Sequence, residues 1–271
     1  MSDRDKSLAA IVLAGQRSTE DPLLEHTGAS CKALVEIVGK PVLLRVLDAL
    51  SEADKVGDIL LAGPDRDQFN ESEVLREACS KHRVSWNEPL RTPSLSAYTL
   101  MQSLPGERPV LLTSADQPFL KAELVDSFCD KSLAQDADVT IGLAPYSLVR
   151  KAFPDMKKTV LRFSDGEYCG CNLFAFLSSD GRRAADHWRA VEEARKSPLK
   201  VIRILGWLPL LRYRLGWLSL PAALDLLSRR FSLRIRAVIL AQADAAIDVD
   251  TVDDYEIVQR ELARRGEGNL R

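Results

Sequence analysis

The sequence predicts an α/β fold, with a mostly parallel sheet and helices on both of its faces. Apolar runs of strand length alternate along the chain with longer segments whose apolar residues recur at helical spacing. The strand-like runs are apolar throughout, which is typical of parallel strands covered by helices on both sides. The length of 271 residues and the 46% share of hydrophobic residues suit one elaborated globular domain spanning residues 1–271.

The first half of the chain repeats a strand followed by a helix. The first strand begins at Leu8, and Pro41 suits the first position of the helix that follows, because its missing N–H needs no partner there. The same unit then recurs along the sequence. We expect strands at residues 8–14, 56–62, 84–86 and 109–113, each followed by a helix, at residues 41–53, 71–82, 94–103 and 121–134.

The rhythm changes after a strand expected at residues 139–143. The turn Ser164-Asp165-Gly166 separates two strand-like runs, which predicts a hairpin or a mixed sheet in this half. We find no internal repeat and no low-complexity linker in the sequence. Further strands are expected at residues 159–163, 168–176 and 233–240, and helices at residues 179–195, 221–230 and 252–264.

A basic and apolar segment at residues 195–236 predicts a helical insertion. It carries ten lysine and arginine residues against the single acid Asp225, and it includes Trp207 and Trp217. Charged residues and Pro209 interrupt it too often for it to span a bilayer. Three interpretations stay open: a cap on the sheet with solvated arginines, a peripheral contact with anionic lipid at the inner face of the membrane, and a pocket for a phosphorylated substrate.

Cysteine content and the N-terminus bear on the compartment. The first ten residues contain no apolar stretch of the kind found in export signals. Five cysteines, an odd number, favour free thiols in a reducing compartment over a disulfide framework. Cys169 and Cys171 lack the spacing of a zinc or redox pair. We expect a cytoplasmic protein with no nucleic-acid partner.

The loop after the first strand suits an anion site. Gly15 lets the backbone approach an oxyanion closely, and Arg17 and Lys32 supply the charge that a triphosphate needs. The carboxyl end of a parallel strand is also where such sheets bind ligands. A tight turn with two solvated cations is the alternative.

Acidic residues follow other apolar runs. Asp116 comes after the strand expected at residues 109–113, where a carboxylate can hold Mg²⁺ against phosphate oxygens; a role as a helix N-cap is the alternative. Near the C-terminus, Asp248 and Asp250 alternate along an expected strand end, and Thr251 suits the N-cap of the last helix. This cap leaves Asp250 as an acid for which the sequence gives no structural role.

Four motifs, in this order, resemble those of the MobA-like nucleotidyltransferases: LAGQR, KALVEIVGKPVL, LLTSADQP and IDVDTVDDYE. The resemblance covers residues 10–262, with a looser match over residues 147–233. It implies a Rossmann-like GT-A nucleotidyltransferase fold and the transfer of NMP from an NTP to a phosphorylated acceptor, with release of pyrophosphate and with Mg²⁺ as cofactor. The loop departs from the family pattern, because Gln16 stands where the family has a second glycine and the loop to Lys32 is longer.

The resemblance also implies roles for single positions. Our own candidates for binding the acceptor phosphate are Lys157, Lys158 and Arg162, on a basic segment that a solvated turn explains equally well. The roles implied by the family are nucleotide binding for Leu13, Ala14, Gly15, Ser94 and Ser96, catalysis for Arg17 and Lys32, Mg²⁺ binding for Asp116 and Asp250, and acceptor binding for Asn172.

Two other function classes stay open. A GT-A glycosyltransferase uses a nucleotide-sugar and usually carries a DxD metal motif, whereas the corresponding place here reads Ser-Ala-Asp-Gln at residues 114–117. A nucleotide-binding protein without catalytic activity is the other, and it is consistent with a loop that has fewer glycines than the family pattern. For the transferase, the acceptor is either a soluble phosphorylated metabolite or a lipid-linked phosphate.

Overall fold

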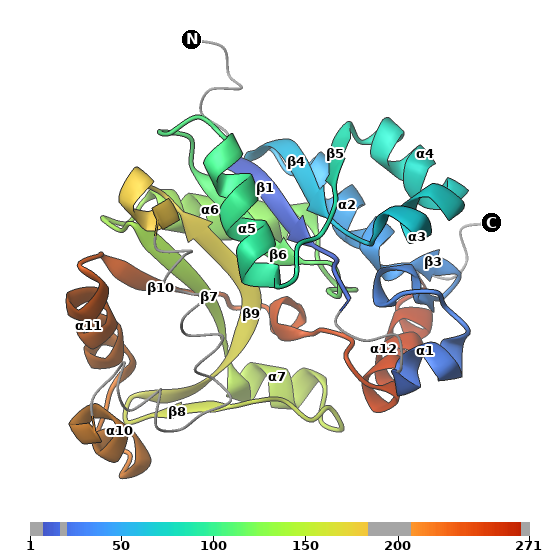
Figure 1. The fold of residues 1–271 in the computed structure, drawn as a ribbon. Coiled ribbons are helices and arrows are strands. Elements are labelled where there is room, and N and C mark those ends of the chain that lie inside the picture. Colours follow the sequence, from blue (N-terminus) through green and yellow to red (C-terminus); the bar gives the residue numbers. More distant parts are fainter. Residues whose placement is uncertain (1–7, 17–20, 184–206, 267–271) are drawn as a thin grey trace.

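The structure is a computed structural model that describes residues 8–16, 21–183 and 207–266. Within these ranges the core is an eight-stranded sheet ordered β10-β7-β9-β6-β1-β4-β5, with β8 paired to β9 beside this path (Figure 1). A separate short pair joins β2 and β3. The strands are β1 (Leu8–Leu13), β2 (Glu36–Ile37), β3 (Lys40–Pro41), β4 (Val56–Ala62), β5 (Val84–Asn87), β6 (Val110–Ser114), β7 (Val139–Pro145), β8 (Leu161–Phe163), β9 (Gly166–Phe176) and β10 (Ile235–Ile239).

The sheet is mostly parallel, as predicted, with one long exception. β1 runs parallel to β4 and β6, β4 runs parallel to β5, and β7 runs parallel to β10. β9 is antiparallel to β6, β7 and β8. The hairpin expected around Ser164-Asp165-Gly166 is therefore confirmed, and so is a mixed sheet.

Helices cover both faces of the sheet. α5 packs on β1 and β4 from one side, and α2 packs on β4 from the other, next to α6. Figure 1 shows α5 in front of the strands and α2 and α6 behind them. The helices are α1 (Pro22–Thr27), α2 (Val42–Glu52), α3 (Arg66–Glu71), α4 (Glu73–Lys81), α5 (Pro93–Ser103), α6 (Ala122–Leu133), α7 (Tyr146–Ala152), α10 (Trp207–Arg214), α11 (Leu220–Phe231) and α12 (Val252–Arg264), with the 3-10 turns η2 (Lys32–Leu34) and η3 (Ala243–Ala246).

β1 shows why a central strand reads as apolar throughout. Ile11 belongs to the same buried cluster as Met101 of α5. Ala10 and Val12 point to the opposite face and belong to the cluster that contains Leu47 of α2. Because successive side chains of a strand alternate between two covered faces, neither face is left for polar residues.

Helix caps explain one difference from the expected elements. The helix expected at residues 71–82 is confirmed as α4, which begins at Glu73, while α3 at Arg66–Glu71 forms where no helix was expected. The Ser72 hydroxyl accepts a hydrogen bond from the Leu75 N–H at 3.3 Å and so caps α4, which places a helix start inside the expected helix.

Three further segments differ from expectation. α1, capped by Asp21, and α7 form where no helix was expected. The expected strand end at Asp248 and Asp250 is wrong, because residues 247–250 belong to no strand. All five cysteines are buried free thiols, as predicted.

The predicted insertion at residues 195–236 is helical in most of its described part. Residues 207–236 contain α10, α11 and the start of β10, while residues 195–206 lie outside the described part of the chain. The helix expected at residues 179–195 is described only as far as residue 183, where it is helical. Among the described helices, none has both the length and the apolar content that crossing a bilayer requires.

The strand order reverses direction at β1. From β1 the chain moves outward through β4 to β5, and it then returns to β6 on the other side of β1. In open α/β sheets, ligands bind at the carboxyl ends of the strands where the order reverses in this way. The carboxyl ends of β1 and β6 are thus the first place to look for a site.

Candidate functional site

The loop that follows β1 is held by both neighbouring strands. The Leu13 carbonyl accepts a hydrogen bond from the Ala115 N–H at 3.0 Å, and the Ala14 N–H donates to the Ala62 carbonyl at 2.8 Å. Ala14 is buried, whereas Gly15 is exposed. Leu13, Ala14 and Gly15 therefore lie at the carboxyl edge, where the sequence predicted a nucleotide loop.

Glycine at two positions lets three loops meet at this edge. Gly63, after β4, has a φ of +96°, and a Cβ there would come within 2.8 Å of the Gly15 nitrogen. A Cβ at Gly15 would lie 3.2 Å from the Cβ of Pro89, in the loop after β5. The loop after β1 is thus closely packed on one side while Gly15 stays open to solvent. Arg17, the predicted catalytic arginine, lies outside the described residues.

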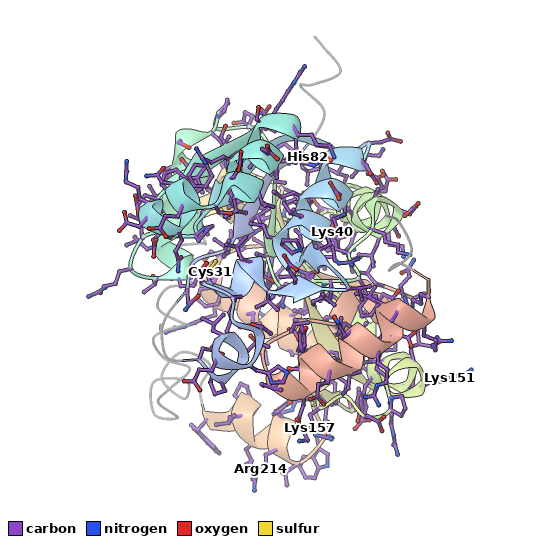
Figure 2. The ribbon with its side chains drawn as sticks, turned by 90° about the vertical axis from the view of Figure 1, so that its right-hand side faces the viewer. Cys31, Lys40, His82, Lys151, Lys157 and Arg214 are labelled. Carbon is purple, nitrogen blue, oxygen red and sulfur yellow. The ribbon has the colours of Figure 1, made fainter. Side chains whose placement is uncertain are left out.

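Lys32 reaches this edge from η2, and Cys31, the residue before it, is labelled in Figure 2. Its backbone N–H donates to Gln16 Oε1 at 3.2 Å, which ties η2 to the loop after β1. Its Nζ lies 3.0 Å from Asp21 Oδ2, 3.1 Å from the Asp250 carbonyl oxygen and 3.6 Å from Asp250 Oδ1. The side chain is 31% exposed, so the ammonium group is paired but reachable from solvent.

Asp116 follows β6 at the same edge and is half-buried. Burial first, and then the charges of Asp248 and Asp250, raise the pKa of its carboxyl group to about 6, against a hydrogen bond from the Ser114 hydroxyl that lowers it. The Val249 N–H donates to the Asp116 carbonyl oxygen at 3.0 Å. The C-terminal segment at residues 248–250 therefore lies directly against the β6 edge.

Asp248 is paired by groups that lie 76 and 90 positions earlier in the sequence. The Lys158 ammonium group forms an ion pair with Asp248 Oδ1, and Asn172 Nδ2 donates to Asp248 Oδ2 at 3.1 Å. The Lys158 side chain is only 9% exposed. The Asn172 carbonyl in turn accepts from Gln117 Nε2 at 3.3 Å. Lys158 and Asn172 were predicted to bind the acceptor, and the structure shows both holding Asp248.

Asp250 has a different environment from Asp248. Its side chain is 64% exposed, and its carboxylate lies 3.6 Å from the Lys32 ammonium group. The predicted cap on the last helix is confirmed, because the Thr251 hydroxyl accepts from the Asp254 N–H and Asp254 reaches back to the Thr251 N–H. Asp250 is thus held next to the site by a helix start in which its own carboxylate takes no part.

The donor chemistry of this edge fits Mg²⁺. In the described part of the chain, no three histidine, cysteine or acidic side chains stand close enough together to form a ready-made metal site. Mg²⁺, however, usually keeps several waters and binds through one or two carboxylates together with substrate phosphates. Asp116 and Asp250 are two such carboxylates, and the mutual repulsion within this acidic group would be relieved by a cation.

The fold and the arrangement of these residues agree with the comparison to known proteins. The MobA-like NTP transferase domain matches residues 10–162, more than half of the chain. The chain belongs to this family. Gly15, Lys32 and Asp116 all lie inside the region that the MobA-like family matches. No match was found among curated proteins.

Solved structures share the whole fold. A hypothetical transferase from Thermus thermophilus is 28% identical with a TM-score of 0.74, covering 92% of this chain and 99% of its own. A 4-diphosphocytidyl-2C-methyl-D-erythritol synthase from Anaerococcus prevotii is 14% identical with a TM-score of 0.58, covering 96% and 99%. A CMP:2-keto-3-deoxy-manno-octonic acid synthetase in complex with CTP is 14% identical with a TM-score of 0.59, covering 96% and 100%. The last two likenesses, at 14% identity, concern the fold alone.

Ser94 and Ser96, which were predicted to bind the nucleotide, lie at the start of α5 in this MobA-like chain. Ser94 and Ser96 are buried. The Ser96 hydroxyl accepts from the Leu90 N–H at 2.8 Å, and the Ser94 hydroxyl lies 3.1 Å from that of Thr92, the N-cap of α5. Both side chains are thus used to shape the loop between β5 and α5, at the same edge as Gly15.

Arg162 stands apart from the cluster around Asp116. It lies on β8, is exposed, and pairs with Glu167 of β9 at 3.0 Å. An open cleft of about 500 Å³ lies nearby, and sequence reasoning missed it because α7 was not expected. Tyr146 and Ser147 at the start of α7, Arg150 and Lys151 at its end, and Glu167 line it.

Proposed function

We propose that this chain transfers a nucleotidyl group from an NTP to a phosphorylated acceptor and releases pyrophosphate. The observation that carries the proposal is the meeting of Lys32, Asp116 and Asp250 beside the loop after β1, at the edge where the strand order reverses. A cation and two carboxylates next to a glycine loop provide the means to hold a triphosphate together with its metal ion. Membership of the MobA-like family supports the same reaction class.

The proposed reaction is an in-line displacement at phosphorus. An oxygen of the acceptor phosphate forms a bond to the α-phosphorus, the bond from that phosphorus to the oxygen bridging to the β-phosphorus breaks, and its electron pair leaves with pyrophosphate. The protein's part is positioning and charge stabilisation. The Lys32 ammonium group is placed to stabilise the charge that grows on the leaving pyrophosphate, and Arg17 is proposed for the same task on the sequence motif.

Mg²⁺ is the proposed cofactor, held by Asp116 and Asp250. When bound, it would neutralise negative charge on the phosphate oxygens. Asp248 is a poorer ligand candidate, because Lys158 and Asn172 already engage its two oxygens. We therefore assign Lys158 and Asn172 a positioning role, in which they hold the segment at residues 248–250 against Asp116.

The acceptor is proposed to enter from the side of α7 and β9. α7 follows the carboxyl end of β7, which is parallel to β6, so the α7 cleft opens at the same edge of the sheet as Asp116. Arg150 and Lys151 line this cleft and supply positive charge for an acceptor phosphate. Arg162 is paired with Glu167 at the rim of the same region.

The first test is a thermal-shift panel with GTP, CTP, ATP and UTP, each with and without Mg²⁺. A ligand that binds only the folded state raises the melting temperature by mass action, so we expect one NTP to raise it in a Mg²⁺-dependent way. Asp116→Asn should lose the Mg²⁺ dependence, whereas Asp67→Asn, an exposed carboxylate on α3, should keep it.

The NTP that gives the shift is then used to screen phosphorylated acceptors for pyrophosphate release. An unchanged melting temperature with all four nucleotides would contradict the proposal. A shift produced by nucleotide-sugars instead would favour the glycosyltransferase.

A further inference from the structure

A surface outside the proposed active site carries five of the ten large exposed apolar side chains in the described part of the chain. We call it the α10 surface. Leu208, Leu211 and Leu215 are 52%, 44% and 48% exposed, and the flanking tryptophans are more exposed still. Its members are Trp207, Leu208, Leu211, Leu215 and Trp217.

The orientation of α10 is fixed by its opposite side. The Tyr213 hydroxyl accepts a hydrogen bond from the Arg162 N–H at 3.3 Å, and the Tyr213 ring meets the Phe163 ring edge-on at 5.6 Å. Pro209 and Leu210 are also only partly exposed. α10 is therefore anchored to β8 by one side, which leaves the other side to solvent.

The outward side is arranged as an apolar strip between two arginines. At about 100° per residue, Leu208 and Leu211 project in similar directions, with Arg212 on one flank and Arg214 on the other. Both arginines are exposed, and Arg214 lies at the lower end of the molecule in Figure 2. Apolar side chains between basic flanks are the pattern of a helix that lies in the plane of a membrane interface.

The turn after α10 adds a second tryptophan to the strip. Gly216 has a φ of +70°, and the Trp217 N–H donates to the Arg212 carbonyl at 2.8 Å, so the chain folds back over the end of the helix. The next residue, Leu218, is buried, and its carbonyl accepts from the Ser164 N–H at 2.9 Å. Trp217 is thus 68% exposed at a place that the β8–β9 hairpin fixes, rather than at a loose end.

Two exposed tryptophans beside arginines are costly in water and favourable at a lipid headgroup. Contiguous apolar patches on soluble monomers mark sites of interaction. Tryptophan prefers the boundary between headgroups and acyl chains, and arginine binds phosphate oxygens. The other large exposed apolar residues, such as Val74 on α4 and Leu133 on α6, lie on separate helices.

We infer that the α10 surface binds the surface of an anionic bilayer, with Trp207 and Trp217 in the headgroup region and Arg212 and Arg214 on lipid phosphates. The argument rests on charge complementarity between the two flanking arginines and an anionic headgroup. The contact is peripheral, because α10 lies along the surface of the protein against β8 (Figure 1). The inference is independent of the proposed reaction.

The test is co-sedimentation of the full chain with two kinds of vesicle. One is pure phosphatidylcholine, and in the other part of it is replaced by phosphatidylglycerol. We expect binding to the anionic vesicles at low ionic strength, with an affinity that falls as salt is added. Two juxtamembrane charges at about 1 kcal/mol each predict that Arg212→Gln with Arg214→Gln weakens this binding about 30-fold.

Matched variants distinguish binding through the α10 surface from binding through the net charge of the protein or through exposed apolar side chains elsewhere. Arg76→Gln with Arg260→Gln changes the net charge equally on exposed positions of α4 and α12 and should bind like the wild type. Trp207→Ser with Trp217→Ser should abolish binding, whereas Val74→Ser with Leu133→Ser should not. All variants replace exposed side chains, and unchanged melting temperatures would show that each is folded.

Three results would overturn the inference. They are no co-sedimentation with anionic vesicles at low salt, equal binding to both kinds of vesicle, and equal loss of binding in the control and α10 variants. Analytical ultracentrifugation identifies the competing occupant: a dimer that disappears in the Trp207→Ser and Trp217→Ser variant, without any vesicle binding, would assign the surface to a second copy of the chain.

Discussion

Asp116 and Asp138 stand at opposite edges of one sheet and have opposite environments. Asp116 follows β6 at the carboxyl edge, where burial raises the pKa of its carboxyl group to about 6. Asp138 precedes β7 at the amino edge, where hydrogen bonds from the Arg234 guanidinium and backbone and from the Ser178 hydroxyl hold its pKa well below the usual range. The fold thus stabilises the ionised form of Asp138, whereas it disfavours the ionised form of Asp116.

The difference separates an acid with a structural role from the acid that we propose as a metal ligand. Asp138 joins the segment before β7 to the start of β10, so its negative charge is part of what holds the sheet edge together. Asp116 has two further acids nearby, and a chain that evolved for stability alone would gain by removing it. Perturbed carboxyl groups of this kind cluster at functional sites because a ligand supplies the missing charge.

Asp116→Asn gives the sharpest test of this contrast. We expect turnover to fall by at least about 100-fold, because a group that binds the reacting phosphates through Mg²⁺ is lost. Without Mg²⁺, the free energy of unfolding at neutral pH should rise by roughly 1–3 kcal/mol, because ionising Asp116 in the folded state is unfavourable. Pyrophosphate release and urea denaturation measure the two effects. Near-normal turnover at saturating Mg²⁺ would remove Asp116 from the metal site.

Lys32→Met tests whether the cation at the same edge is functional. We expect turnover to fall about 10- to 100-fold from the loss of charge stabilisation. The free energy of unfolding should change by less than about 1 kcal/mol, because the Lys32 pairs with Asp21 and Asp250 are partly exposed.

The matched control for this variant is Lys40→Met. Lys40 pairs with Asp48, which His82 also contacts, and its side chain is 40% exposed. Figure 2 shows Lys40 and His82 above Cys31, on the side of the molecule away from α10. Equal losses of turnover in the two lysine variants would mean that Lys32 acts through general stability or charge.

Asp138→Asn should reverse the pattern of Asp116→Asn. We expect the free energy of unfolding to fall by about 2 kcal/mol at neutral pH, because charge-assisted hydrogen bonds to a buried carboxylate are lost. Turnover per folded molecule should stay at the wild-type value. Denaturant unfolding with an activity assay at low temperature would check this, and a selective loss of turnover would place Asp138 in the functional class.

The pH dependence of stability gives the smallest expected effect. The pKa of Asp138 is lower in the folded than in the unfolded state, so its contribution is present above about pH 4 and is lost as the pH falls toward the folded-state value. Arg234→Met should weaken the dependence of the free energy of unfolding on pH below about pH 4, because the group that lowers the pKa of Asp138 is removed. Arg236→Met, which removes an exposed pair with Asp225 and a hydrogen bond to the Ile235 carbonyl, should leave this pH dependence unchanged.

The elements that the sequence predicts well are those with a single strong cause. β1, β4 and β6 are apolar on both faces, and α12 begins with a capping box, so local pattern alone defines them. α3 was missed because it buries none of its residues and so lacks an apolar pattern, and its available signal was the N-cap Asp65. α1 carried a usable signal in Asp21-Pro22, an N-cap followed by proline.

The sequence predicted single residues of the candidate site, but it did not predict which of them pair with one another. Motifs placed Gly15, Lys32 and Asp116 at one edge, because the carboxyl ends of parallel strands share that edge. The pairing of Lys158 with Asp248 joins distant parts of the sequence, and no local pattern encodes it. The same reason explains why Lys158 was predicted to bind a ligand when it holds the chain's own carboxylate.

The hydrogen bond from Val249 to Asp116 has a consequence for how this family is inherited. The match to the family domain ends at residue 162, yet Asp248, Val249 and Asp250 come from beyond it, as does β9, which lies between β6 and β7. A fragment cut where the similarity ends would keep Lys32 and Asp116 and lose the groups that face them. The region that matches the family domain is therefore shorter than the region that gene fusion or recombination would have to keep whole for the site to form.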